Sequence, residues 1–285
     1  MDKNYTDNTY GTLVIELTYD CDMRCPWCIE AAHVGKKAGA LSPVALSRIL
    51  ERTLVRPYKN YVFQGGEPLI HALYMLAIVD AITEKQPDSH FRLFTNGTHL
   101  TSHLVGELNR RDIQVIVSLE ATGYKGVTNF ILHHAKDPEN ALENIRQLHD
   151  KWLRIVATRE KIAKETLAGE ILLLHNYIPD CIIEVTLDLT QLEAYTLEDI
   201  QKLGEQYTAL KNRIPGSVSW FIPLQGHTRH CDAFTEWYIL ETDSIKEKCP
   251  LADRPASGCG ALRGRMKPEV YEAYTKITEN TIGVM

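Results

Sequence analysis

The chain has 285 residues, of which 44% are hydrophobic and 24% are charged, an ordinary composition for a globular protein. A formal net charge of −6 indicates no nucleic-acid surface, and no apolar run approaches the roughly 20 residues of a membrane helix. The first residues lack the apolar core of a signal peptide, and the seven cysteines are an odd number. We therefore expect a cytoplasmic protein without a disulfide framework.

Three cysteines lie close together just after the first predicted strand, at residues 13–17. They are Cys21, Cys25 and Cys28, a C-x3-C-x2-C spacing, and the proline between the last two argues against a helix. The backbone must curl so that three thiolates converge, and such soft ligands indicate zinc, copper(I) or an iron–sulfur cluster. Zinc would need a fourth ligand such as His33, and a redox pair would leave Cys21 without a role. The spacing favours a cluster in which one iron has no protein ligand.

A glycine turn follows the second predicted strand, at residues 61–63. Its sequence is Gly65-Gly66-Glu67-Pro68. Two glycines let the backbone approach a ligand closely, and a carboxylate beside them can accept an ammonium group. Alone, such a turn is ordinary loop punctuation, so its meaning depends on the cysteine segment before it.

Strands and helices alternate along most of the chain. Further strands are predicted at residues 91–94, 115–119, 154–158 and 181–189. A first helix is predicted to begin at Ser42-Pro43 and to carry Leu46, Ile49, Leu50 and Leu54. A second is predicted over residues 69–84, with Leu73, Leu76, Ala77 and Ile82 facing inward. A third is predicted from Thr101 or Ser102 to Arg110. A fourth helix is predicted to begin at Asp137-Pro138 and to carry Leu142, Ile145, Leu148 and Trp152. A fifth is predicted over residues 164–177. A sixth is predicted to begin with a capping box at Thr196–Asp199 and to carry Ile200, Leu203, Tyr207 and Leu210. Residues 124–136 are expected to form a loop over the active face.

This alternation predicts an α/β fold with a parallel sheet and right-handed crossovers, a partial (β/α)6 TIM-like barrel. In such barrels the functional residues lie at the carboxyl ends of the strands. The cysteine segment, the glycine turn, Asn96, Ser118 and Glu120 all fall there. We expect the barrel over residues 1–213, and over residues 214–285 a short irregular α+β extension that does not continue it.

Together, the cysteine triad and the Gly-Gly-Glu-Pro turn resemble the signature of the radical S-adenosylmethionine (SAM) superfamily. The resemblance implies the same partial barrel, with a [4Fe–4S] cluster on Cys21, Cys25 and Cys28. It also implies that the amino and carboxylate groups of SAM chelate the fourth iron. The residues that it assigns to SAM are Gly65, Gly66 and Glu67 at the amino group and Trp27 near the adenine.

Four further polar positions match places where members of that family contact SAM. Asn96 lies in a Thr-Asn-Gly turn that is near SAM in relatives, although the same residues also form bare turns. Ser118 and Glu120 resemble a serine-x-acid pattern and would contact the ribose and methionyl ends of SAM. The alternative is a strand-end serine and a solvated glutamate. Arg159 would pair with the SAM carboxylate or lie on the surface.

The predicted extension carries Cys231, Cys249 and Cys259, and the Cys-Gly-Ala beginning at Cys259 looks like the opening of a SPASM or twitch domain. Glu272 and Ala273 stand where that pattern has Pro-Cys, and the seven cysteines of a full SPASM domain are absent, which excludes a two-cluster tail. Three hypotheses stay open: one auxiliary cluster, a thiol that donates a hydrogen atom to a substrate radical, and packed small hydrophobes. We take forward the auxiliary cluster.

The resemblance implies that an electron, from a donor such as flavodoxin or ferredoxin, cleaves SAM to a 5′-deoxyadenosyl radical that abstracts hydrogen from a substrate. The SPASM-like tail favours a peptide substrate that is epimerised or cross-linked, although no peptide-recognition winged helix is evident in the residues given before the first strand. The runner-up is a small metabolite such as a sugar, amino acid or nucleoside. A glycyl-radical activase would have a glycine-rich lead-in at the first strand, and a non-enzymatic cluster carrier would leave the glycine turn without a role.

Overall fold

The computed structural model describes residues 10–31, 33–34, 41–55, 57–119, 138–220, 235–239, 244–246 and 265–279. Its strands are β1 (Tyr10–Thr18), β2 (Tyr58–Gly65), β3 (His90–Thr95), β4 (Ile113–Ser118), β5 (Lys151–Ala157), β6 (Ile182–Leu187), β7 (Val218–Trp220), β8 (Thr235–Ile239) and β9 (Ser244–Lys246). Its helices are α1 (Pro43–Val55), α2 (Ala72–Lys85), α3 (Ser102–Arg110), α4 (Pro138–Arg146), α5 (Arg159–Ala163), α6 (Leu167–Tyr177), α7 (Leu197–Arg213) and α9 (Pro268–Glu279), with the 3₁₀ turns η1 (Pro68–His71) and η3 (Leu192–Ala194).

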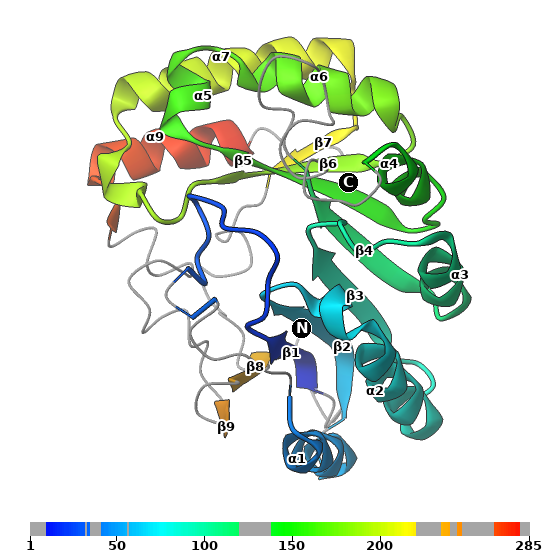
Figure 1. Cartoon of the computed structure of the whole chain (residues 1–285). Helices are drawn as coiled ribbons and strands as arrows, with labels where there is room; N and C mark the ends of the chain where they lie inside the picture. The colour runs from blue at the N-terminus through cyan, green and yellow to red at the C-terminus, as the bar shows by residue number, and fades with distance from the viewer. Residues whose placement is uncertain are drawn as a thin grey trace, which may run out of the picture.

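Within the described ranges, nine strands form one sheet in the order β7-β6-β5-β4-β3-β2-β1-β8-β9. From β1 to β7 each strand pairs in parallel with the next one in the sequence, and a helical connection joins each pair. Figure 1 shows the sheet curving, with the helices from α1 to α7 along its outer side. The predicted partial barrel of parallel strands is therefore confirmed.

The chain after Ile214 adds strands to both edges of this sheet. Strand β7 pairs in parallel with β6, and β8 pairs in parallel with β1 and antiparallel with β9. Helix α9 packs on α7, where a Cβ atom at Gly204 would lie 3.0 Å from the side chain of Ile277. The expectation that this part of the chain does not continue the barrel is thus wrong for its described residues, because strands of three to five residues show too little periodicity to be recognised. The domain boundary after residue 213 stays a prediction.

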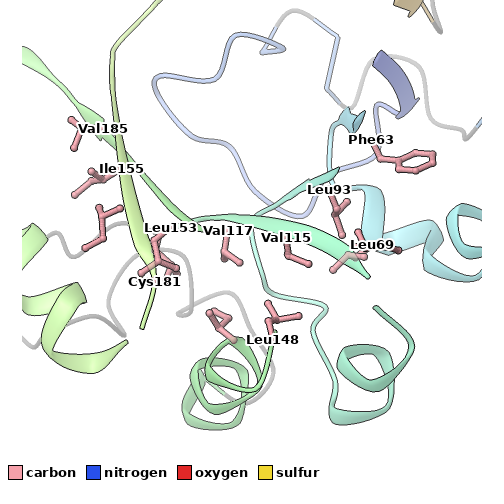
Figure 2. Close-up of a cluster of buried hydrophobic side chains, with 14 of the residues drawn as sticks. Phe63, Leu69, Leu93, Val115, Val117, Leu148, Leu153, Ile155, Cys181 and Val185 are labelled. Carbon is pink, nitrogen blue, oxygen red and sulfur yellow. The ribbon is translucent and has the colours of Figure 1, made fainter. Parts of the chain in front are cut away.

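The hydrophobic core lies between the sheet and the outer helices. Leu93, Val115, Val117, Leu153 and Ile155 come from three neighbouring strands, and all are fully buried. Figure 2 shows these side chains in one continuous band, with Leu148 beneath them. Because side chains alternate across a strand, the residues between them face the opposite, concave side of the sheet.

Helix α2 presents a different face from the one predicted. Its buried apolar residues are Met75, Leu76, Ile78, Val79 and Ile82. Leu73 is 82% exposed and Ala77 is also exposed, so their predicted inward positions are wrong. The turn η1 occupies the residues predicted to begin the helix, and its three residues per turn change the phase of the helix after it. Leu54, predicted as an apolar position of α1, is likewise exposed.

Trp152 lies in strand β5, where it pairs with Ile116 of β4, and its predicted place on a helix is wrong. Helix α4 ends at Arg146 because the side chain of Asn109, on α3, stabilises a turn there. Asn109 Nδ2 donates to the Gln147 carbonyl at 2.9 Å, and its Oδ1 accepts from the His149 N–H at 2.9 Å. A residue remote in the sequence thus ends the helix, which local periodicity does not reveal.

The helix predicted over residues 164–177 is α6, which begins three residues later at Leu167, and the short helix α5 before it was not predicted. Glu165, between them, has φ of 56°, a left-handed conformation that no α-helix continues through. The predicted caps are confirmed elsewhere: Ser42 Oγ accepts from the Ala45 N–H at 3.1 Å, and Thr196 and Asp199 form the reciprocal capping box.

Among the described helices, none combines the length and apolar character needed to cross a membrane.

Candidate active site

Three loops meet at the carboxyl ends of β1, β2 and β3, which are neighbours in the sheet. The cysteine loop, residues 19–31, leaves β1 and contains turns but no helix or strand. The glycine turn, residues 65–68, ends β2, and the turn at residues 95–99 follows β3. Because these strands are neighbours, the cysteine loop and the glycine turn, which were predicted to act together, lie side by side, and the turn at residues 95–99 lies next to them (Figure 1).

Gly65 and Gly66 allow the glycine turn to contact the main chain that leads into the cysteine loop. Gly66 N donates to the Thr18 carbonyl at 2.6 Å, and Glu67 N donates to the Asp20 carbonyl at 2.7 Å. A Cβ atom at Gly65, whose φ is 132°, would lie 2.2 Å from Thr18 O, and one at Gly66 would lie 2.2 Å from Asp20 O. No other residue fits at these two positions. The close approach that requires glycine is therefore made to the main chain at Thr18 and Asp20.

The Glu67 carboxylate is fully buried and accepts three hydrogen bonds from the protein. Its Oε1 accepts from Thr95 Oγ1 at 2.7 Å and from the Leu69 N–H at 3.0 Å, and its Oε2 accepts from the Asn96 N–H at 2.7 Å. Burial raises the pKa of Glu67 to about 7, although these hydrogen bonds favour the charged form. The carboxylate therefore holds the glycine turn against the turn after β3.

Asp22 joins the cysteine loop to that same turn. Its Oδ1 accepts from Asn96 Nδ2 at 2.8 Å, its Oδ2 accepts from Thr98 Oγ1 at 2.6 Å, and His99 Nε2 lies 3.4 Å from Oδ2. Partial burial alone would raise the pKa of Asp22, but the hydrogen bonds from Thr98 and Asn96 hold it below its usual value. The sequence prediction did not identify Asp22, because its partners lie more than seventy residues away in the chain.

Asn96 is thus engaged by protein groups at three of its atoms. Its main-chain N–H donates to Glu67, its Nδ2 donates to Asp22, and its Oδ1 accepts from the Thr98 N–H at 2.9 Å. The Thr-Asn-Gly turn is therefore more than a bare turn, since its asparagine connects the other two loops.

The three loop thiols lie near enough to influence one another's ionisation. Burial raises the pKa of Cys21 to about 11. The pKa of Cys25 is raised to about 12, mainly by burial and to a smaller extent by the negative charges of the Cys28 and Cys21 thiolates. Burial also raises the pKa of Cys28. The Met23 N–H donates to Cys21 Sγ at 3.4 Å. Three neighbouring cysteine thiols are the ligand type that an iron–sulfur cluster requires, and binding of a cluster would release the thiol protons.

In the described part of the chain, no three His, Cys, Asp or Glu side chains, these thiols included, are arranged around a single metal ion. Trp27, in the cysteine loop, lies near helix α5. The Lys161 ammonium, on α5, lies 5.6 Å from the Trp27 ring centroid and 3.1 Å from Glu170 Oε2. Lys161 and Glu170 are both buried, so this loop reaches across to α5.

Ser118 ends β4 on the concave side of the sheet, opposite Arg154 of β5. Arg154 lies 2.6 Å from Glu184 Oε2, and its guanidinium carbon lies 4.4 Å from the Phe94 ring centroid. The sequence prediction did not identify this ion pair. The feature that could have revealed it is the opposite charge of two residues that pair directly across neighbouring strands, Arg154 and Glu184. Arg159, the first residue of α5, donates to Asp199 Oδ2 at 2.9 Å.

The family model described as the Radical SAM superfamily matches residues 15–159, which is 145 of the 285 residues. The match begins within β1, includes all three loops and ends at the start of α5. The chain belongs to the radical SAM superfamily. Radical SAM enzymes use SAM and a [4Fe–4S] cluster, and the three thiols of the cysteine loop suit that cluster.

Other radical SAM proteins of known structure share this fold. Native anSMEcpe with bound AdoMet has a TM-score of 0.57 at 18% identity, over 74% of this chain and 63% of that chain. SuiB of Streptococcus suis, solved bound to precursor peptide SuiA, has a TM-score of 0.61 at 15% identity, over 95% of this chain and 67% of SuiB. At these identities the likeness shows the barrel fold.

A PqqA peptide cyclase from Gluconobacter oxydans (strain 621H) is 21% identical in an alignment of 190 positions that covers 58% of this chain and 49% of the cyclase. The chain therefore spans about half the length of this curated relative. The SAM contacts predicted for Trp27, Gly65, Gly66, Glu67, Asn96, Ser118 and Arg159 stay predictions. Glu120, the loop predicted over residues 124–136 and the cysteines at 231, 249 and 259 lie outside the described residues.

Proposed function

We propose that this radical SAM enzyme modifies a peptide, by epimerisation or by cross-linking. The observation that carries the proposal is the sequence likeness to a PqqA peptide cyclase. The fold shared with SuiB, which was solved with its precursor peptide, supports it over nearly the whole chain. The native anSMEcpe structure with AdoMet and the Cp18Cys peptide, at a TM-score of 0.54 and 18% identity, adds a second peptide complex with the same fold.

The residues of the chain have separate parts in this proposal. Cys21, Cys25 and Cys28 hold a [4Fe–4S] cluster, which when bound supplies the electron that cleaves SAM to the 5′-deoxyadenosyl radical. Glu67 holds the glycine turn beside the cluster loop, where SAM binds. The curved sheet shields the reacting groups from water, and Arg154 and Glu184 give its concave side a polar surface suited to a peptide backbone.

The test is incubation of the reconstituted enzyme with SAM, a reductant and a peptide encoded by a short reading frame beside its gene. Mass spectrometry should show either loss of two hydrogen atoms, for a cross-link, or deuterium incorporation from heavy water, for an epimer. An unmodified peptide together with modification of a sugar, amino acid or nucleoside would replace this proposal with a small-metabolite enzyme.

Replacing Glu67 with Ala should weaken SAM binding about tenfold while the iron content stays at the wild-type level, because Glu67 orients the loops but does not ligate iron. Calorimetric titration of SAM into the reconstituted protein measures this effect. Glu51→Ala is the matched control, since Glu51 is an exposed glutamate on α1. Unchanged SAM affinity in Glu67→Ala would show that the glycine turn has no part in SAM binding.

We also propose one auxiliary cluster on Cys231, Cys249 and Cys259. Anaerobically reconstituted protein should then contain about eight irons per chain, and replacing all three cysteines with Ala should reduce this to about four. The cluster on the cysteine loop would remain in that variant. Constant iron with product lost through one particular cysteine would indicate a hydrogen-atom donor instead, and no change in either would leave these cysteines with a packing role.

A further inference from the structure

We propose that Asp22 is a positioning residue that fixes the cysteine loop, and through it the cluster, relative to the SAM site. The inference rests on the proposed cluster role of Cys21, Cys25 and Cys28, and it assigns a function to a residue between the first two of them. Asp22 itself ligates no iron in this account.

The geometry shows that the Asp22 side chain links the cysteine loop directly to the turn after β3. Its two carboxylate oxygens accept from different residues, Asn96 Nδ2 at 2.8 Å and Thr98 Oγ1 at 2.6 Å. Hydrogen bonds to a carboxylate are among the stronger ones in proteins, and two on separate oxygens fix the orientation of the group. Because the cysteine loop contains only turns, side-chain contacts of this kind have a large share in setting its position.

The link continues from Asn96 to the glycine turn. The Asn96 N–H donates to the buried Glu67, so a single residue is held by one carboxylate from the cysteine loop and by another from the glycine turn. On the other side of Cys21, Asp20 Oδ2 lies 3.0 Å from His71 Nε2, in the 3₁₀ turn that follows Glu67. The first cluster cysteine is thus flanked by two aspartates, each in contact with a different neighbouring loop.

A positioning role makes a specific prediction for paired variants. Asp22→Ala and Asn96→Ala both break the same hydrogen bond, while Asn96→Ala keeps the main-chain N–H that Glu67 accepts. If the two residues act through this contact, the double variant should be less impaired than the product of the two single effects predicts, because the hydrogen bond that they share can be lost only once. Two residues that contacted SAM independently would instead have effects that multiply.

The experiment uses reconstituted full-length protein and two measurements, the SAM dissociation constant and the rate at which a chelator removes the cluster. Asp22→Ala should weaken SAM binding and accelerate cluster loss by about tenfold each, the usual size of such effects around metal sites. Asp88→Asn, in an exposed turn, is the control and should match the wild type. Asp22→Asn and Thr98→Val change fewer contacts, and should give smaller effects in the same direction even where an alanine variant folds poorly.

Wild-type values for both measurements in Asp22→Ala would overturn the inference, as would multiplicative effects in the double variant. A lowered melting temperature of the cluster-free protein, with SAM affinity and cluster loss unchanged, would also overturn it by showing a merely structural role. A wild-type protein that binds no cluster would instead contradict the proposed function, so the two failures are distinguishable.

Discussion

Replacing any one of Cys21, Cys25 and Cys28 with Ala should abolish SAM cleavage. Each variant removes one of the three thiolates that we propose as cluster ligands, and a cluster with two protein ligands would lose both its stability and its open iron. The measurement is formation of 5′-deoxyadenosine from SAM with dithionite, together with the iron content of the reconstituted protein. The product should fall to the background of the assay in all three variants.

Cys181→Ala is the matched control for this series. Cys181 is buried before β6, and its Sγ donates to the Ile178 carbonyl at 3.0 Å, away from the three loops. The variant should keep its iron and its SAM cleavage, at a cost of about 1 kcal/mol in the free energy of unfolding. Full SAM cleavage in any of the three loop variants would contradict the ligand assignment.

The second large effect is expected for Gly66→Ala. The new methyl group would lie 2.2 Å from the Asp20 carbonyl oxygen, so either the glycine turn or the cysteine loop must move. We expect a loss of about 2–4 kcal/mol in the free energy of unfolding, and SAM cleavage close to background because the two motifs no longer fit together. Thermal unfolding and the 5′-deoxyadenosine assay measure the two effects.

Gly106→Ala separates this steric effect from a general effect of losing glycine. Gly106 lies on the exposed side of α3, and a Cβ atom there would meet no other atom within 4 Å. That variant should be more stable by about 0.5–1 kcal/mol, since alanine favours a helix, and should keep full activity. A Gly66→Ala protein with the stability and activity of the wild type would show that the close contact with Asp20 has no importance.

The sequence predicted the barrel well because its strands contain short apolar runs and its helices carry clear caps. It also located the cysteine loop and the glycine turn, since both motifs are short and contiguous. The predictions failed where distant residues decide local structure. Asn109 ends helix α4 from a neighbouring helix, so Trp152 was predicted on a helix when it lies in strand β5.

The connections within the site were beyond sequence reasoning for the same reason. Glu67 was predicted to receive the amino group of SAM, and its buried carboxylate accepts from Leu69, Thr95 and Asn96. Asp22 gave no local signal at all, because its hydrogen bonds depend on the order of β1 and β3 in the sheet. Spacing within a motif reveals which groups act together, whereas the contacts that orient them require the fold.

The central claim is that the cysteine loop carries a cluster whose open iron binds SAM. Electron paramagnetic resonance of the anaerobically reconstituted, reduced protein tests it most directly, with and without SAM. A [4Fe–4S]⁺ signal that changes on addition of SAM, and that is lost in Cys21→Ala, is the predicted result. A protein without such a cluster, or a cluster signal that SAM leaves unchanged, would contradict the account.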